Sequence, residues 1–231
     1  DFLLDYTKLL PLRKTAVEVN KTWAEQLGIN QSAAVTCVKP SGTVSELVDS
    51  ASGMHPRWAS YYIRTVRADN KDPLTQFMKD QGIPNEPALG KEESTTVFSF
   101  PKKSPKGSVT TDDLTSTTHF FNYLTIQQYY CEHKPSVTIN VAEDDWINMA
   151  SQVYDNFHAM VGVSFLPAVD HVYKQAPFQT CTEEEYLAAV AKQPSKIDWS
   201  KLKDYEKGVD TTTASQELAC TGGVCSIVDV G

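Results

Sequence analysis

The chain has 231 residues, of which 41% are hydrophobic, 10% aromatic and 22% charged, and this is the composition of a folded globular protein. Its 21 Lys and Arg against 29 Asp and Glu leave a net charge of −8, so the whole chain lacks the positive field with which proteins bind nucleic-acid polymers or anionic membranes. No apolar run approaches the roughly 18 residues that would span a bilayer. We therefore predict no nucleic-acid or membrane partner.

The number and spacing of the cysteines indicate the cellular compartment of the protein. Five cysteines, an odd number thinly spread, are typical of a reducing compartment rather than of a disulfide-stapled secreted protein. We therefore predict a cytoplasmic protein. The sequence begins at Asp1 without an initiator Met, and we expect it to be a piece of a longer polypeptide.

The first predicted element is a helix over residues 12–27. Apolar residues recur there at spacings of three and four, which predicts one buried helical face, and Gly28 supplies a C-terminal stop. The apolar run from Ala33 to Val38, ended by Pro40 and Gly42, predicts a strand buried on both faces.

Strands and helices are expected to alternate along the next 150 residues. β-Branched and aromatic runs predict strands at 61–66, 95–100, 136–141 and 162–166. Acidic residues at the expected helix N-termini predict helices over 72–82, from 112 towards 131, over 144–158 and over 183–192. This order of about five strands predicts an α/β fold with a mainly parallel sheet. We expect residues 1–207 to form it and residues 208–231, which begin in a Gly- and Thr-containing linker, to be a flexible tail.

The first candidate site is the loop from Pro40 to Ser45. It follows a predicted strand and precedes a predicted helix, which is where α/β proteins bind ligands. Gly42 lets the backbone approach an anion, helical N–H groups would point at it, and hydroxyls of Ser41, Thr43 and Ser45 add donors. We predict phosphate binding. The alternative is that Thr43 and Glu46 form only a capping box, and both interpretations can hold together.

The second candidate site is the pair Cys220 and Cys225. They are five residues apart around Gly222 and Gly223, so a disulfide between them closes easily, and a pair on a long arm could exchange with a distant disulfide. Zinc is a poorer interpretation because four ligands are normally needed, and we predict no metal site. The alternative to a redox-active pair is that the two cysteines are free thiols without a function. His55 and His133, each near Pro in a turn, are interpreted as structural.

Taken together, several motifs resemble the C-terminal region of adenosylcobalamin-dependent (class II) ribonucleotide reductases, most closely the monomeric ribonucleoside-triphosphate reductase type. The motifs occur in the same order and cover nearly the whole chain: Val38 to Ser45, Gly53 to Pro56, Tyr61 to Arg67, Tyr130 to Ile139 and Gly162 to Pro167.

The resemblance implies specific roles. It implies that Pro40, Ser41, Gly42, Thr43, Val44 and Ser45 bind the substrate phosphates inside a ten-stranded α/β barrel, of which this chain is the C-terminal half. It implies that Cys220 and Cys225 reduce an active-site disulfide and are themselves reduced by thioredoxin or a glutaredoxin-like protein. The reaction implied is radical reduction of the ribose 2′-hydroxyl of a ribonucleotide with adenosylcobalamin as cofactor.

The family's thiyl-radical cysteine and effector site belong to its N-terminal portion, so we expect that half, fused or separate, to be a partner and the chain alone to be catalytically incomplete. Two other interpretations stay open on the sequence. One is a stand-alone nucleotide-binding α/β module without catalysis. The other is a thiol-disulfide carrier.

Overall fold

The structure is a computed structural model that describes residues 4–168 and 174–206. The chain divides into two compact units. Unit 1 comprises residues 1–59 and 104–171, and unit 2 comprises residues 60–103 and 172–231. The predicted boundary between residues 207 and 208 lies outside the described residues and stays a prediction.

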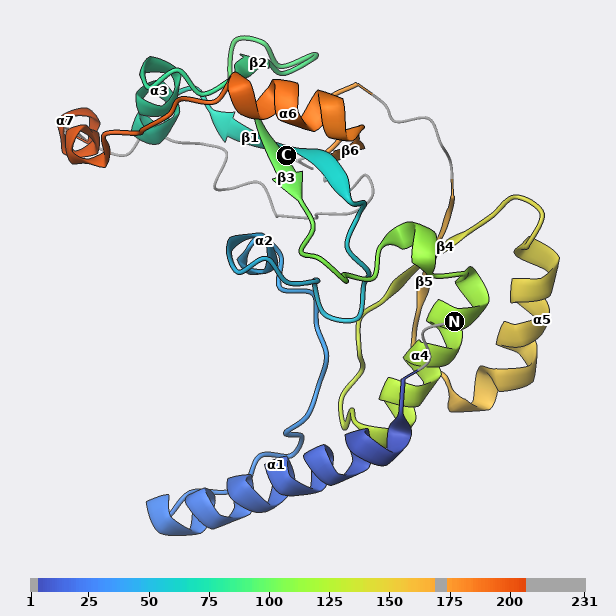
Figure 1. The fold of residues 1–231 in the computed structure, drawn as a ribbon. Coiled ribbons are helices and arrows are strands. Elements are labelled where there is room, and N and C mark those ends of the chain that lie inside the picture. Colours follow the sequence, from blue (N-terminus) through green and yellow to red (C-terminus); the bar gives the residue numbers. More distant parts are fainter. Residues whose placement is uncertain (1–3, 169–173, 207–231) are drawn as a thin grey trace, which may run out of the picture. The chain divides into compact units, whose positions relative to one another are not determined.

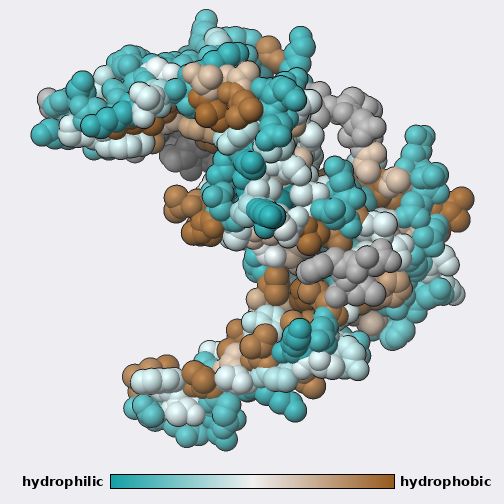
Figure 2. Space-filling model, in the orientation of Figure 1, coloured by the Kyte–Doolittle hydropathy of each residue, from teal (hydrophilic) through white to brown (hydrophobic). Residues whose placement is uncertain are grey.

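Unit 1 begins with the predicted helix, which is longer than expected. Helix α1 spans Tyr6–Leu27; the Asp5 side chain caps it by accepting the N–H of Thr7, and Gly28 ends it in the left-handed conformation at φ 65°. The expected buried face is wrong, because Ala24 is the one fully buried residue of this helix. Trp23 is 57% exposed and Leu27 64%, and Figure 2 shows hydrophobic side chains along α1.

The predicted strand over 33–38 is absent. This segment has no regular secondary structure, and two of its N–H groups bond to a side chain rather than to a neighbouring strand. The carboxylate of Glu132 accepts the N–H of Val35 at 2.9 Å and that of Thr36 at 3.2 Å. These charge-assisted bonds lower the pKa of Glu132.

Apart from the short helix α2 (Val44–Leu47), the remaining elements of unit 1 include a short parallel sheet (Figure 1). They are a 3-10 turn Thr111–Asp113, α4 Ser116–Tyr129, β4 Thr138–Val141, α5 Trp146–Asn156, a 3-10 turn Phe157–Ala159 and β5 Ser164–Pro167. Strands β4 and β5 are parallel, with Thr138 opposite Ser164. The helix expected from residue 112 is divided, because Thr115 caps α4 by accepting the N–H of Thr118.

The core of unit 1 lies between α4, α5 and these two strands. It contains Phe120, Tyr123, Val137, Ile139, Val141 and Met149. Tyr123 is fully buried, and its hydroxyl accepts the N–H groups of Val161 at 3.0 Å and Gly162 at 3.2 Å. This side chain therefore fixes the backbone that leads into β5.

Unit 2 is built on an antiparallel sheet, so the expectation of a mainly parallel sheet is wrong. Its order is β2-β3-β1-β6, and every neighbouring pair is antiparallel. The strands are β1 Tyr61–Asp69, β2 Asn85–Pro87, β3 Thr95–Lys103 and β6 Phe178–Thr180. Strands β1 and β3 pair along their whole length, and their pairing shows that the intervening helix does not serve as a crossover between parallel strands.

The described residues of unit 2 also form three helices and a 3-10 turn: α3 Pro73–Asp80, α6 Glu183–Ala191, a 3-10 turn Trp199–Lys201 and α7 Leu202–Tyr205. As predicted, Asp72 caps α3, with Pro73 in its first turn. Thr182 and Glu185 form a capping box at α6. Among the described residues, no helix has both the length and the apolar character that crossing a bilayer requires. The half-barrel itself stays a prediction.

Candidate functional site

The predicted phosphate loop is exposed in unit 1. Residues 40–44 are exposed and Ser45 is buried. Gly42 has φ 60°, a conformation that favours glycine, and a Cβ there would meet nothing within 4 Å. Within the described part of the chain, the N–H groups of Gly42 and Thr43 have no hydrogen-bond partner. Two adjacent amides are thus available to an anion.

The other loop donors stabilise the loop itself. The Ser41 hydroxyl accepts the N–H of Ser45 at 3.1 Å, and the Ser45 hydroxyl donates to the carbonyl oxygen of Gly42 at 3.2 Å. The N–H of Ser41 donates to the Ser52 hydroxyl at 3.0 Å. Of the three hydroxyls expected to bind an anion, that of Ser45 has its O–H engaged, whereas those of Ser41 and Thr43 can still donate.

The helix after the loop differs from both interpretations of the sequence. Helix α2 spans only Val44–Leu47, and Thr43 makes no side-chain cap, so the capping box is absent. A helix of four residues has too few aligned peptide dipoles to contribute much to anion binding. Any affinity for phosphate therefore comes from the unpartnered amides and from neighbouring positive charge.

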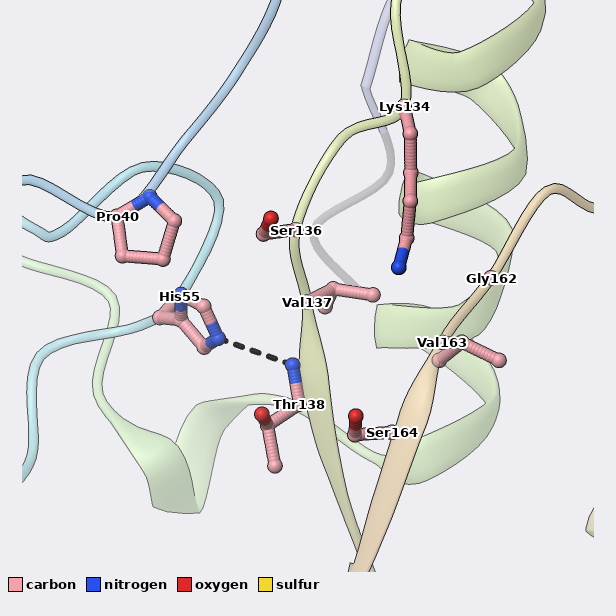
Figure 3. A pocket seen from close by; sticks show the side chains of 9 residues that line it. All are labelled: Pro40, His55, Lys134, Ser136, Val137, Thr138, Gly162, Val163 and Ser164. Atoms are coloured by element: carbon pink, nitrogen blue, oxygen red, sulfur yellow. Dashed lines mark hydrogen bonds between the residues drawn. The ribbon is translucent and has the colours of Figure 1, made fainter. Parts of the chain in front are cut away.

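A small cavity of about 150 Å³ adjoins the loop at Pro40 (Figure 3). The other residues that line it come from the turn after α2 and from the starts of β4 and β5: His55, Lys134, Ser136, Val137, Thr138, Gly162, Val163 and Ser164. Whole-ligand pockets are typically about 300 Å³ or larger. The cavity therefore suits one small group, such as a phosphate, rather than a complete nucleotide.

His55 is structural, as the sequence indicated. Its Nε2 accepts the N–H of Thr138 at 3.0 Å, as Figure 3 shows. Its Nδ1 lies 2.9 Å from the carbonyl oxygen of Ser52 and must donate to it. These two partners assign the neutral tautomer with the proton on Nδ1. The ring links the segment after the loop to the first residue of β4.

Two lysines that the sequence prediction did not include bring positive charge to this site. The Lys39 ammonium donates to the Ser136 hydroxyl at 3.0 Å. The Lys134 side chain extends into the cavity in Figure 3, beside Gly162. A Cβ at position 162 would lie 2.7 Å from Lys134 Cε and 2.9 Å from its Nζ, so glycine leaves the space that this lysine occupies. Lys134 belongs to the motif from Tyr130 to Ile139, and this is the one feature of the sequence that could have drawn attention to it. Its distance from the loop along the chain gave no indication that the two are close.

Behind the cavity wall, His119 is buried and uncharged. It is 5% exposed, its Nε2 donates to the carbonyl oxygen of Met54 at 3.1 Å, and its ring centre lies 6.1 Å from that of His55. Burial, reinforced by the neighbouring His55, lowers the pKa of His119 from 6.5 to about 4.

We expect this histidine to make unit 1 acid-sensitive. The unfolded chain protonates His119 near pH 6.5 and the folded chain only near pH 4, so its contribution is complete above pH 6.5 and declines as the pH falls towards 4. The free energy of unfolding should therefore fall by roughly 2 kcal/mol between pH 7.5 and pH 5. Urea unfolding across this range should show a smaller loss for His119→Gln, which keeps a donor for Met54. Equal losses for both proteins would contradict this assignment.

The second predicted site, Cys220 and Cys225, lies outside the described residues. Within residues 4–168 and 174–206, no group of three or more His, Cys, Asp or Glu side chains is arranged to hold a metal ion. The described thiols Cys37, Cys131 and Cys181 are free.

Comparison with known proteins confirms the resemblance seen in the sequence. No family model matches. The chain is 28% identical over 222 residues to the adenosylcobalamin-dependent ribonucleoside-triphosphate reductase of Lactobacillus acidophilus, covering 94% of this chain and 29% of that protein. It is 28% identical over 206 residues to the reductase of the same name from Euglena gracilis, covering 87% of this chain and 28% of the relative.

A solved structure agrees in fold. The crystal structure of a B12-dependent (class II) ribonucleotide reductase matches with a TM-score of 0.74 and 24% identity, over 89% of this chain and 29% of the other. The described residues thus share their fold with part of that reductase. The chain spans less than a third of the length of the curated relatives it matches.

Proposed function

We propose that this chain is the part of an adenosylcobalamin-dependent ribonucleoside-triphosphate reductase that holds the substrate by its phosphates, in the loop Pro40–Ser45. The observation that carries the proposal is the pair of unpartnered amides at Gly42 and Thr43, exposed beside a cavity with a lysine. The relatives support it, because 94% of the chain aligns with reductases of this name.

Local charge explains how an acidic chain binds an anion. The net charge is −8, so long-range attraction does not favour a nucleotide. Lys39 and Lys134 add positive charge around Ser136, which lies close to the loop. The amides and the lysines together hold phosphate oxygens and thereby orient the ribose for reduction of its 2′-hydroxyl.

The tail completes the redox cycle in this proposal. The 2′-hydroxyl leaves as water and is replaced by hydrogen, and a pair of active-site thiols supplies the two electrons and two protons by becoming a disulfide. Cys220 and Cys225 then exchange with that disulfide: their own thiols are oxidised and the active-site pair is reduced again. Thioredoxin or a glutaredoxin-like protein returns Cys220 and Cys225 to the dithiol state.

The cofactor of the relatives does not fit the cavity described here. Adenosylcobalamin is a corrinoid much larger than a drug-sized ligand, and a cavity of about 150 Å³ is too small even for the latter. We therefore assign no cofactor contact to these residues and derive no step through adenosylcobalamin. The portion of the reductase that this chain lacks is the partner proposed to bind it.

A charge reversal in the loop tests phosphate binding. Thr43 is exposed, so Thr43→Glu should leave the fold intact while placing a carboxylate beside the two available amides. We expect the dissociation constant of a ribonucleoside triphosphate, measured by calorimetry, to rise at least about tenfold, since repulsion between charges about 4 Å apart exceeds 1 kcal/mol.

Thr43→Gln is the matched control, because glutamine has the shape of glutamate without its charge. It should bind the triphosphate within about threefold of the original chain. If Thr43→Glu binds as tightly as Thr43→Gln, the loop does not hold the phosphates.

A further inference from the structure

Two cysteines outside the proposed redox tail are brought together in unit 1. Cys37 precedes the loop and Cys131 follows α4, and backbone hydrogen bonds connect their segments. The N–H of Glu132 donates to the carbonyl oxygen of Thr36 at 2.9 Å, and that of Ser136 donates to Val38 at 3.1 Å. Cys37 is therefore flanked on both sides by residues that are bonded to the segment of Cys131.

The side chains of these cysteines also approach one another. The Cys37 thiol points towards the other segment, with Sγ 3.4 Å from the carbonyl oxygen of Lys134. Burial raises the pKa of the Cys131 thiol; a hydrogen bond from the Val38 backbone opposes this rise, and interaction with the adjacent Cys37 thiol adds to it. The thiol of Cys131 thus lies near both the backbone N–H of Val38 and the thiol of Cys37.

The two thiols differ in accessibility. Cys131 is 3% exposed, whereas Cys37 is partly exposed. A small oxidant reaches Cys37 first, and Cys131 is protected until Cys37 has reacted. This arrangement of one accessible cysteine beside a second that can resolve it is typical of redox-sensing sites.

We propose that Cys37 and Cys131 form a reversible disulfide when the chain meets a peroxide. In the first step the Cys37 sulfur attacks one peroxide oxygen, the O–O bond breaks, and Cys37 becomes a sulfenic acid as hydrogen peroxide is reduced to water. In the second step the Cys131 sulfur attacks the Cys37 sulfur, the S–O bond breaks, and the hydroxide leaves with the Cys131 proton as a second water. A thiol reductant reverses the oxidation by exchange.

The bond would connect the two segments that border the cavity. Cys37 lies two residues before Lys39, and Cys131 lies three residues before Lys134. Oxidation therefore fixes the backbone on both sides of the site without altering a residue that lines it. This inference is independent of the proposed function, because it depends only on the two thiols and their segments.

Mapping the bond in a chain with two thiols tests the proposal. Cys181, Cys220 and Cys225 are replaced by serine, and the folded protein is treated with a slight excess of hydrogen peroxide and then alkylated. Trypsin should yield peptides 22–57 and 107–174, each with one cysteine, because it does not cleave before Pro40 or Pro135. We expect these peptides to be joined, with the loss of two hydrogens, and to separate after dithiothreitol.

Further substitution of Cys131 by serine is the control, and it should leave Cys37 oxidised to a sulfenic or sulfinic acid. Because the bond closes a loop of about 95 residues, the oxidised two-thiol chain should also unfold several degrees above its reduced form. Recovery of both cysteines separately alkylated or separately oxidised, or linked only between molecules, would overturn the proposal.

Discussion

Replacing Gly53 by alanine is expected to distort the phosphate loop from outside it. Gly53 has φ 63°, and a Cβ there would lie 2.8 Å from the carbonyl oxygen of Lys39 and 3.2 Å from the nitrogen of Pro40. These are backbone atoms that cannot rotate away, so the Lys39–Pro40 peptide must move. We expect the free energy of unfolding to fall by about 2–4 kcal/mol, from left-handed strain plus overpacking. Urea unfolding measures this change.

Gly107→Ala is the control for Gly53→Ala. Gly107 also lies in unit 1 with positive φ, 82°, but a Cβ there meets nothing within 4 Å. The free energy of unfolding of Gly107→Ala should fall only by the left-handed strain, which is about 1–2 kcal/mol. We also expect Gly53→Ala, but not Gly107→Ala, to weaken binding of a ribonucleoside triphosphate. Equal effects of the two substitutions would show that the contact with Lys39 does not position the loop.

The importance of Gly53 could not be predicted from its sequence neighbours. The sequence places it in a turn before His55 and Pro56, and a turn explains its positive φ. Its close approach to Lys39 depends on how residues 39–53 fold back on themselves. A pattern of residue types carries conformational preference, but not the distance between two backbone segments.

Helix ends were predictable where their chemistry is local. Asp72 with Pro73 at α3 and Gly28 after α1 were identified from sequence, because a cap involves residues within one turn. The strand over 33–38 was wrongly predicted for the opposite reason. The N–H groups of Val35 and Thr36 bond to Glu132, which is 97 residues from Val35 along the chain, and apolar composition does not show such a partner.

Strand direction was the larger error. The sequence located β1, β3, β4 and β5 with good accuracy, and helices do separate them. A helix between two strands permits either a crossover to a parallel neighbour or a return to an antiparallel one. Strands β4 and β5 follow the first course, and β1 and β3 the second. Two strands of three residues, β2 and β6, were too short to give a period-two pattern.

The candidate site was predicted in part for the same physical reason. The exposed loop with Gly42 is one continuous segment, and its residue types indicated its conformation. The cavity beside it gathers Lys134 from the segment before β4 and Gly162 from the segment before β5. Their proximity follows from the parallel pairing of β4 and β5, and neither residue has a local signal for phosphate binding.

In a complete reductase that contains this chain, replacing both Cys220 and Cys225 by serine is expected to abolish repeated turnover. Serine cannot exchange with a disulfide, so in the proposed cycle thioredoxin would have no route through the tail to the oxidised active-site thiols. We expect the steady-state rate with thioredoxin to fall at least about 100-fold, whereas pre-reduced enzyme still completes one turnover at a near-normal rate. Rapid quenching of the first turnover separates the two quantities.

Cys181→Ser is the matched control, because it removes a thiol of this chain that has no proposed redox role. Burial raises the pKa of Cys181, with Glu185 adding to the effect, so less of this thiol is present as the nucleophilic thiolate at neutral pH. Its substitution should leave both the first turnover and the steady-state rate near normal. If the Cys220 and Cys225 variant instead lost the first turnover, the pair would act in the chemical step, and an undiminished steady-state rate would mean that electrons reach the active site without the tail.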